Sequence, residues 1–414
     1  MRMTLPPTGA SHDAILSTMR DMKHGDVDWQ NGRAPLYLFK ADDATYAIGK
    51  AGFNEYFSEN ALGARRAFPS VKRMEAEVVD MALDLFSAPA EAQGFMTSGG
   101  TESIIMAVQT CRDWSRAQRA APHHRGNIVA AETLHPAFNK AAKLMDLAVR
   151  RAPVGPDLRM DLAAVEALID ADTIMIVGSA PNFPYGIIDP IRELAAIAER
   201  HKLWLHVDAC VGGYLAPFVR MNGRSIPDFD FAIPAVSSLS ADLHKFGFCP
   251  KPASTIFYRT PDQAHHHHFD ETVWPSGRFL TSTIVGTRPG GGVAGAWATL
   301  NFLGVAGYRR IARELMEFID AYRSGIGAIA GLKILGAPDL SIVAYGSDEF
   351  DVFRVAELMA EKGWLPGLVQ KPKGIHRMMS LLHAPVLTAY LDDASADVGV
   401  VRQTGATATI KASY

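Results

Sequence analysis

The chain has 414 residues, a formal net charge of −3, and a composition that is 48% hydrophobic and 21% charged. This length exceeds what one compact core holds and fits two lobes, while the small net charge gives no electrostatic reason to expect nucleic acid or an anionic membrane as the main partner. The three cysteines, Cys111, Cys210 and Cys249, form no CxxC pair, which argues against a disulfide framework or a zinc site and favours a reducing compartment.

The N-terminal stretch MRMTLPPTGASHDAIL lacks the apolar core of a signal peptide. We therefore expect a cytoplasmic or otherwise soluble protein.

From about residue 70 to 260, helix-like and strand-like runs alternate. SVKRMEAEVVDMALDLF has Val71, Met74 and Val78 on one helical face, with Ser70 as the expected N-cap. Further helices are expected at TESIIMAVQTCRDW and PIRELAAIAERHK, and strands at GFMTSGG, NIVAAE, TIMIVGSAP, LWLHVDAC and AVSSLS. This alternation predicts a mainly parallel sheet that is covered by helices.

Two later stretches each allow more than one structural interpretation. HHHH at 265–268 is internal and is followed by strand-like sequence, so we interpret it as a surface loop rather than a metal tract. The longest uncharged stretch, Pro289 to Tyr308, starts with a run of glycines and contains Asn301, which predicts a loop followed by a buried helix and no membrane span.

After about residue 300 the pattern mixes helices, YRRIARELMEFIDAYRSGI and DVFRVAELMAEKG, with short strands, LSIVAYG and HRMMSLLH. We expect an N-terminal segment over residues 1–60, a large domain over 61–300 and a smaller C-terminal α+β domain over 301–414. The predicted fold class is α/β.

Ligands of α/β sheets bind at the carboxyl ends of the strands, and four sequence features would lie there. TSGGTES, at 97–103, ends a strand in two glycines and begins a helix at Thr101. Free N–H groups and the helix dipole suit a phosphate at such a turn, although Thr101 could equally be a simple cap. Asp208 ends an apolar strand, where a carboxylate needs either a protonated partner or backbone N–H groups.

The third feature is Lys245, which follows a run of small and apolar residues in SLSADLHKFGFCPK. Burial lowers the pKa of a lysine, so its neutral amine could attack a carbonyl; the alternative is a structural ion pair. The fourth is His135, just before an expected helix near Pro136, where it could stack on an aromatic ring or cap the helix. Together the four fit pyridoxal 5'-phosphate.

Seven stretches carry a resemblance to a known family. They are FPSVKRMEAEVV, TSGGTESIIMA, HPAFNKAA, FPYGIIDPI, LHVDACVGG, SADLHKFGFCPK and GTRPGG. In this order, over roughly residues 30 to 414, they resemble the fold-type-I, group II decarboxylase-like enzymes that use pyridoxal phosphate, and within them the sphingosine-1-phosphate lyase branch. The resemblance implies an aspartate-aminotransferase-like fold and a bacterial-type member without the membrane helix of eukaryotic relatives.

The resemblance also implies residue roles. Lys245 matches the lysine that bonds to the cofactor, Asp208 the partner of the pyridine nitrogen, and His135 the ring-stacking histidine. Gly100, Thr101 and His244 match phosphate contacts, and Thr287 matches a phosphate contact given by the partner subunit of a homodimer. Cys210 is expected under the other face of the ring. Asn60 and Lys251 match substrate-binding positions, and Lys245, Tyr185 and Tyr37 are the candidates for catalytic proton transfer.

The implied reaction cleaves the C2–C3 bond of a phosphorylated long-chain base into a fatty aldehyde and ethanolamine phosphate, without a metal. One departure concerns the substrate, since Gly63 in NALG stands where the family has a histidine; Arg65 and Arg66 could substitute for it, or be solvated. An L-amino-acid decarboxylase on the same scaffold is the alternative, and a homologue without activity is disfavoured because Lys245, Asp208 and the glycine loop are intact.

Overall fold

The computed structural model describes residues 2–413, and its centre is a sheet of seven strands. The strand order is β1-β7-β6-β5-β4-β2-β3. Five adjacent strands run parallel, and β7 is antiparallel to both of its neighbours. In chain order the strands are β1 (Gln93–Thr97), β2 (Asn127–Ala131), β3 (Ala148–Ala152), β4 (Thr173–Ser179), β5 (Trp204–Asp208), β6 (Val236–Ala241) and β7 (Ser254–Tyr258).

The central strands are buried on both faces, as a parallel sheet requires. Val129 and Leu205 pack on one side and Ile128 and Trp204 on the other, so successive side chains belong to two separate hydrophobic clusters. Helices α4 (Gly100–Gln118) and α5 (Ala137–Met145) cover the second side. The first side packs against α3 (Pro69–Leu85), α6 (Leu162–Leu168), α7 (Ile191–His201) and α8 (Ala216–Met221).

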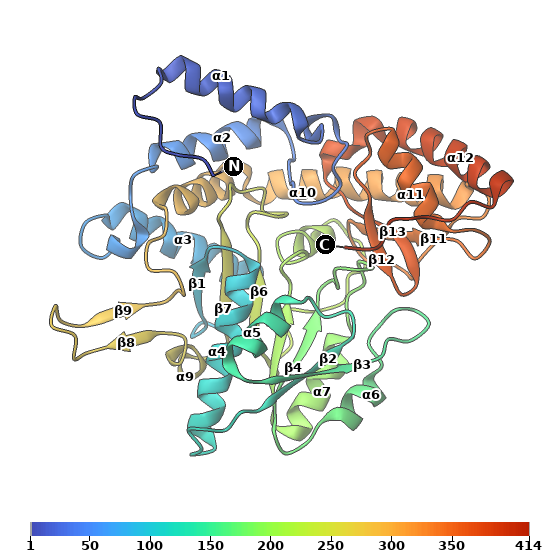
Figure 1. Ribbon diagram of the computed structural model, residues 1–414. Coiled ribbons are helices and arrows are strands. Elements are labelled where there is room, and N and C mark those ends of the chain that lie inside the picture. The colour runs from blue at the N-terminus through green and yellow to red at the C-terminus, as the bar shows by residue number, and fades with distance from the viewer. Residues whose placement is uncertain (1, 414) are drawn as a thin grey trace.

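A smaller C-terminal unit packs beside the large sheet (Figure 1). Its antiparallel sheet has the order β10-β11-β13-β12. The strands are β10 (Lys333–Ile334), β11 (Ile342–Gly346), β12 (Gly367–Gln370) and β13 (Lys373–Met378), and the helices are α11 (Val352–Glu361) and α12 (Leu387–Thr404), with a 3-10 turn, η4 (Leu381–Val386). The predicted α/β class, with a mainly parallel sheet and a smaller α+β unit at the C-terminal end, is confirmed.

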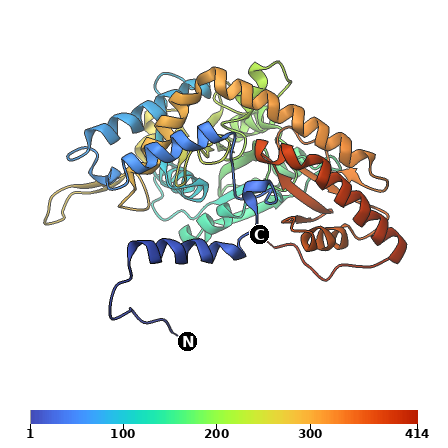
Figure 2. The same ribbon diagram turned by 90° about the horizontal axis from the view of Figure 1, so that it is seen from above.

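One long helix, α10 (Gly290–Ala328), connects the two units, with a kink at Gly304 where φ is 51°. The N-terminal region contributes α1 (His12–Met22), η1 (Lys23–Gly25), η2 (Trp29–Asn31), α2 (Asp43–Glu55) and η3 (Ala61–Gly63). Figure 2 shows α1 standing away from the body, and none of its residues is buried. A short helix, α9 (Pro261–His265), precedes a projecting hairpin of β8 (Phe269–Glu271) and β9 (Phe279–Thr281).

Four local predictions were wrong. Helix α3 begins at Pro69 with Phe68 as its N-cap, so Ser70 is inside the helix; proline suits the first turn because it needs no N–H partner there. The glycine run after Pro289 is already helical. The strand expected at HRMMSLLH ends at Met378.

The fourth wrong prediction concerns the histidine tract, His265 to His268, which is not a surface loop. His267 is fully buried, its ring is stacked on Phe95 at 4.0 Å between centroids, and it is hydrogen-bonded to the Tyr258 hydroxyl and the Ser282 carbonyl. Burial lowers the pKa of His267 to about 3, so the ring is neutral and can fill an apolar site. In residues 2–413, no helix combines the length and the apolar character needed to cross a membrane.

Candidate active site

The carboxyl ends of β4, β5 and β6 and the first turn of α4 surround a pocket of about 390 Å³. This is the edge where ligands of parallel sheets bind. The pocket collects seven residues that the sequence singled out: Gly100, Thr101, His135, Asp208, Cys210, His244 and Lys245. It also contains residues that sequence reasoning missed: Glu102, Phe183 and Asp242.

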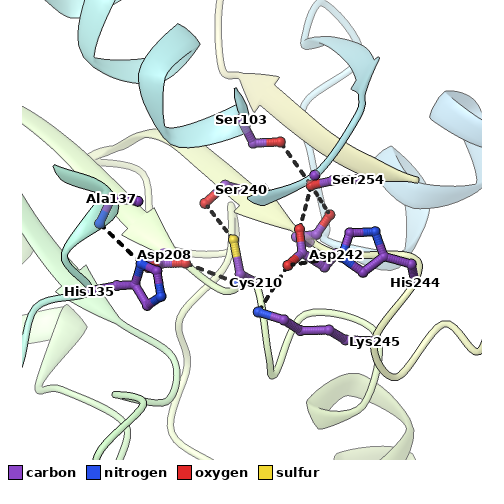
Figure 3. A network of polar contacts seen from close by, with 12 residues as sticks. Ser103, His135, Ala137, Asp208, Cys210, Ser240, Asp242, His244, Lys245 and Ser254 are labelled. Carbon is purple, nitrogen blue, oxygen red and sulfur yellow. Dashed lines mark hydrogen bonds and ion pairs between the residues drawn. The ribbon is translucent and has the colours of Figure 1, made fainter. Parts of the chain in front are cut away.

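Asp242 is the nearest acidic group to Lys245. The Lys245 Nζ lies 2.9 Å from Asp242 Oδ2, and the Asp242 side chain is 2% exposed (Figure 3). Burial by itself lowers the pKa of Lys245, but the carboxylate of Asp242 and other negative groups outweigh it, so the pKa lies above its usual value. The expected depressed pKa was therefore wrong, because sequence reasoning weighed desolvation without this carboxylate.

Asp242 is held from several sides. Ser254 Oγ donates to its Oδ1, its backbone N–H donates to the Cys210 carbonyl at 3.2 Å, and the His244 Nε2 lies 3.8 Å from its Oδ2. Burial raises the pKa of Asp242, yet the charges of Lys245 and His244 and the Ser254 hydrogen bond bring it below the usual value. The pair is thus an ammonium and a carboxylate.

The first turn of α4 forms one end of the pocket, and this end suits an anion. Helix N-termini present unpaired N–H groups and a positive dipole end to an anion. A Cβ on Gly100 would lie 2.8 Å from Asp242 Oδ2 and 3.0 Å from Cys210 Sγ, so only glycine fits this close approach. Beneath it, the hydroxyls of Thr97, Ser103 and Ser254 form a chain with Oγ distances of 2.6 and 2.8 Å.

Glu102 connects this turn to a distant segment. Its Oε2 accepts from the Ser98 N–H at 2.7 Å, while its Oε1 accepts from the N–H groups of Ile284 and Val285 at 2.8 and 3.3 Å. The same carboxylate therefore connects the glycine loop to the irregular segment that precedes Thr287. Sequence reasoning could not find this contact, because the partners are about 180 residues apart.

The other end of the pocket holds Asp208, His135 and Cys210. Asp208 Oδ1 accepts from the Cys210 N–H at 3.1 Å, and the side chain makes no ion pair with a described lysine, arginine or histidine within 4.0 Å. His135 Nδ1 accepts from the Ala137 N–H at 3.2 Å, so it caps α5 while its ring lines the pocket. Burial lowers the pKa of His135 and raises that of the Cys210 thiol, which leaves both groups neutral.

These residues fit pyridoxal phosphate. The cradle at Gly100 suits an anionic group at one end, and Asp208, which has no cationic partner among the described residues, suits a protonated ring nitrogen at the other. The Lys245 amine lies in the same pocket, on the side of Asp242. The His135 ring and the Phe183 ring, which meet edge to face at 6.2 Å, form a wall suited to a flat aromatic group.

Five predicted residues do not line this pocket. The Tyr185 hydroxyl donates to the Lys371 carbonyl of the small unit, and burial raises the pKa of Tyr185 to about 12. Tyr37 is 50% exposed, and its carbonyl accepts from Lys251 Nζ at 3.0 Å. Burial and the charge of Lys245 lower the pKa of Lys251.

Asn60 and Thr287 contact each other outside this pocket. Asn60 Nδ2 donates to Thr287 Oγ1 at 3.4 Å, and Asn60 also bridges to Pro289. Thr287 is exposed. Arg65 and Arg66 follow nearby, are exposed, and have no carboxylate within 4.0 Å among residues 2–413. Gly63, at the position of the family histidine, packs near Phe68.

A second pocket of about 480 Å³ adjoins the first, and His135 and Phe183 line both. It lies between the large and small units. Its apolar lining includes Leu36, Leu134, Pro136, Val154, Pro184, Leu368 and Val369, and Tyr185 and Lys371 are also part of it.

Comparison with known proteins gives a consistent result. The family described as "Pyridoxal-dependent decarboxylase conserved domain" matches residues 56–346. A sphingosine-1-phosphate lyase of Oryza sativa is 37% identical over 97% of this chain and 75% of its own length. A solved sphingosine-1-phosphate lyase of Burkholderia pseudomallei superposes with a TM-score of 0.93 and 34% identity, over 97% of this chain and 94% of that one. A glutamate decarboxylase of Lactobacillus brevis, 18% identical with a TM-score of 0.84 over 98% and 96% of the two chains, shares the fold.

Proposed function

Because the chain belongs to the pyridoxal-dependent decarboxylase family and, within it, to the sphingosine-1-phosphate lyases, we propose that it is a pyridoxal-phosphate-dependent lyase that cleaves phosphorylated long-chain bases. The substrate's C2–C3 bond breaks, the C3 hydroxyl gives up its proton to leave a fatty aldehyde, and C2 gains a proton to leave ethanolamine phosphate.

When bound, pyridoxal phosphate supplies an electron sink for the charge that bond cleavage leaves on the carbon beside the substrate amine. Lys245 is the residue that would bond to the cofactor, and its amine would serve in proton transfer when free. Asp208 would keep the ring nitrogen protonated, and the first turn of α4, with Thr101 and His244, would bind the phosphate. His135 and Cys210 would contact the ring.

The adjoining apolar pocket is the observation that favours a lipid over an amino acid. A compact site would suffice for an amino acid, whereas a long alkyl chain needs apolar surface beside the reacting carbons. The second pocket offers about 480 Å³ and shares the His135 and Phe183 wall with the first. Each buried methylene contributes about 0.8 kcal/mol, so several of them give substantial affinity.

Lys251 and Asn60 are proposed substrate-binding residues. Lys251 is near enough to Lys245 for the two charges to interact, its Nζ donates to the Tyr37 carbonyl, and its ammonium suits the substrate phosphate. The loss of the family histidine at Gly63 is compensated by Arg65 and Arg66, which have no acidic partner among the described residues.

We further propose a homodimer in which Thr287 reaches the cofactor phosphate of the partner subunit. Thr287 is exposed, and so are apolar side chains of the β8–β9 hairpin turn and of the segment just before Thr287: Val273 is 86% exposed, Trp274 52%, Ile284 54% and Val285 41%. Exposed apolar side chains in such number favour a protein interface.

Tyr185 and Tyr37 are the proposed partners of Lys245 in proton transfer. With its pKa raised to about 12, Tyr185 acts as a hydrogen-bond donor rather than as a base at neutral pH. The Tyr185 hydroxyl donates to the Lys371 carbonyl of the small unit, and the Tyr37 carbonyl accepts from Lys251 Nζ.

The alternative is an L-amino-acid decarboxylase, which would share the whole cofactor set. The test is to mix the purified protein with sphingosine 1-phosphate and to assay for long-chain aldehyde by mass spectrometry. Aldehyde release that disappears in Lys245→Ala supports the lyase. Carbon dioxide release from a panel of amino acids, with no aldehyde, would instead identify the chain as a decarboxylase. The replacement of the family histidine by Gly63 would then be the first explanation to test for the lost activity on phosphorylated bases.

A further inference from the structure

We propose that Asp242 is a positioning residue for Lys245, which it holds as an ammonium ion whenever the amine is not bonded to cofactor and from which it takes the proton when the amine reacts. The inference rests on the proposed function, in which Lys245 is the cofactor-bearing lysine. It assigns a task to a buried carboxylate that otherwise has no part in the reaction.

The geometry restricts what Asp242 can do. It follows β6 directly, it is 2% exposed, and its Oδ2 lies 2.9 Å from Lys245 Nζ (Figure 3). Its other oxygen accepts from the neutral Ser254 hydroxyl. Lys245 is therefore the only full positive charge in hydrogen-bond contact with this carboxylate among the described residues, because His244 Nε2 is 3.8 Å away and its pKa is lowered by burial.

A buried carboxylate without a cation costs several kcal/mol, as does a buried ammonium without an anion. Moving one proton from Nζ to the carboxylate converts the ion pair into a neutral amine and a carboxylic acid. Protons and charge balance, and neither state leaves a single buried charge. The pair can thus present a nucleophilic amine without expelling a proton through the pocket, and can recharge the lysine when it is released.

The other acidic groups of the pocket are differently placed. Asp208 makes no ion pair with a described cation within 4.0 Å, and Glu102 accepts from three backbone N–H groups. The remaining titratable groups that face Lys245 and Asp242 are Cys210 and His135, which are neutral, and Lys251, whose positive charge works against protonation of Lys245. Asp208 also raises the pKa of Lys245, without contacting it, so Asp242 is the acidic group in direct contact with the amine and the one placed to take its proton.

A second role for Asp242 must be separated from this one. Through Ser254 it also ties the end of β6 to β7 and to the hydroxyl chain under α4. Asp242→Asn keeps a carbonyl oxygen for the Ser254 hydrogen bond and removes only the charge. Ser254→Ala removes the hydrogen bond and keeps the charge, so it is the matched control.

The test measures the protonation of Lys245 itself. The full-length protein is stripped of cofactor with hydroxylamine and labelled competitively with acetic anhydride from pH 6 to 11, and the peptide that contains Lys245 is quantified by mass spectrometry. We expect the labelling curve of Asp242→Asn to lie about one to three pH units below that of the wild type, and Ser254→Ala to follow the wild type. If Asp242→Asn does not fold, Asp242→Glu, which keeps the charge but misplaces it, should give a smaller shift in the same direction.

An unchanged curve in Asp242→Asn, or an equal shift in Ser254→Ala, would overturn the proposal. A second readout separates it from the proposed function. Pyridoxal phosphate is added to the stripped proteins between pH 6 and 9, and the bond is fixed with borohydride. Capture on Lys245 that rises less steeply with pH in Asp242→Asn than in the wild type supports the proposal. Capture on another lysine would refute the assignment of Lys245, whatever the labelling curves show.

Discussion

Gly100→Ala is the sharpest test of how the phosphate end of the pocket is built. The added Cβ would lie 2.8 Å from Asp242 Oδ2 and 3.0 Å from Cys210 Sγ, where ordinary contacts are longer. Neither neighbour can retreat, because Asp242 is held by Lys245 and Ser254 and Cys210 is buried against Ser240. The glycine loop must move instead.

Overpacking of this kind costs about 1 to 3 kcal/mol. If the loop moves outward in the absence of cofactor, the overpacking weakens cofactor binding rather than folding, because the cofactor binds only when the loop is in its original position. At about 1.4 kcal/mol per factor of ten, the cofactor dissociation constant should rise about 5- to 150-fold. If the loop cannot relax, the cofactor-free protein should melt at a lower temperature instead.

The assay is an equilibrium titration of stripped protein with pyridoxal phosphate, read by absorbance, beside thermal melting without cofactor. Gly399→Ala is the control, since that glycine lies in α12 and an added Cβ has no heavy atom within 4 Å. It should leave cofactor affinity unchanged and stabilise the helix slightly. A Gly100→Ala protein with cofactor affinity within twofold of the wild type and an unchanged melting temperature would refute the close approach.

Three further predictions follow from single contacts. Burial raises the pKa of Asp189 to about 7, above its unfolded value near 3.9, so its stabilising contribution is complete below pH values near 3.9 and is lost as pH rises toward 7. Buried neutral histidines such as His267 change the stability in the opposite direction over this range, so the quantity to measure is the difference in unfolding free energy between the wild type and Asp189→Asn. That difference should shift against the wild type by about 1.4 kcal/mol per pH unit between pH 5 and 7, and a difference that does not change with pH would contradict this. Tyr185→Phe removes the hydrogen bond to the Lys371 carbonyl and should lower the free energy of unfolding by about 1 kcal/mol. If Tyr185 takes part in proton transfer, kcat should also fall at least tenfold, and an unchanged kcat would show that Tyr185 is not catalytic. Glu102→Gln should accelerate hydrogen exchange at the Ser98 and Ile284 amides by about tenfold, whereas unchanged protection would show that other contacts hold the loop.

Much of the large domain was predictable because the relevant signals are local. Strands such as Thr173–Ser179 are short, mostly apolar and buried throughout, as burial on both faces demands. Helices such as Ile191–His201 show apolar residues at helical spacing in the sequence. The positions of Lys245, Asp208, His135 and the glycine loop at strand ends follow from the same alternation. Their common pocket is a consequence of a parallel sheet, whose carboxyl ends meet at one edge.

Other features depended on contacts between distant segments. The sequence did not reveal that β7 would run antiparallel between β1 and β6, since pairing direction depends on the neighbours that the fold supplies. His267 looked polar and exposed, but a neutral imidazole with two hydrogen bonds and an aromatic stack is stable when buried. Glycines after Pro289 looked like a loop, yet tertiary packing keeps them helical.

The charge on Lys245 shows most clearly what the sequence determines and what depends on the tertiary structure. The sequence by itself determined that a lysine would stand at the end of a buried strand, next to His244 and within a recognisable motif. Whether its pKa falls or rises is set by competition between desolvation and nearby charge, which depends on distances of a few ångströms. Only the tertiary structure, which puts the Asp242 carboxylate 2.9 Å from the amine, decided in favour of the ammonium.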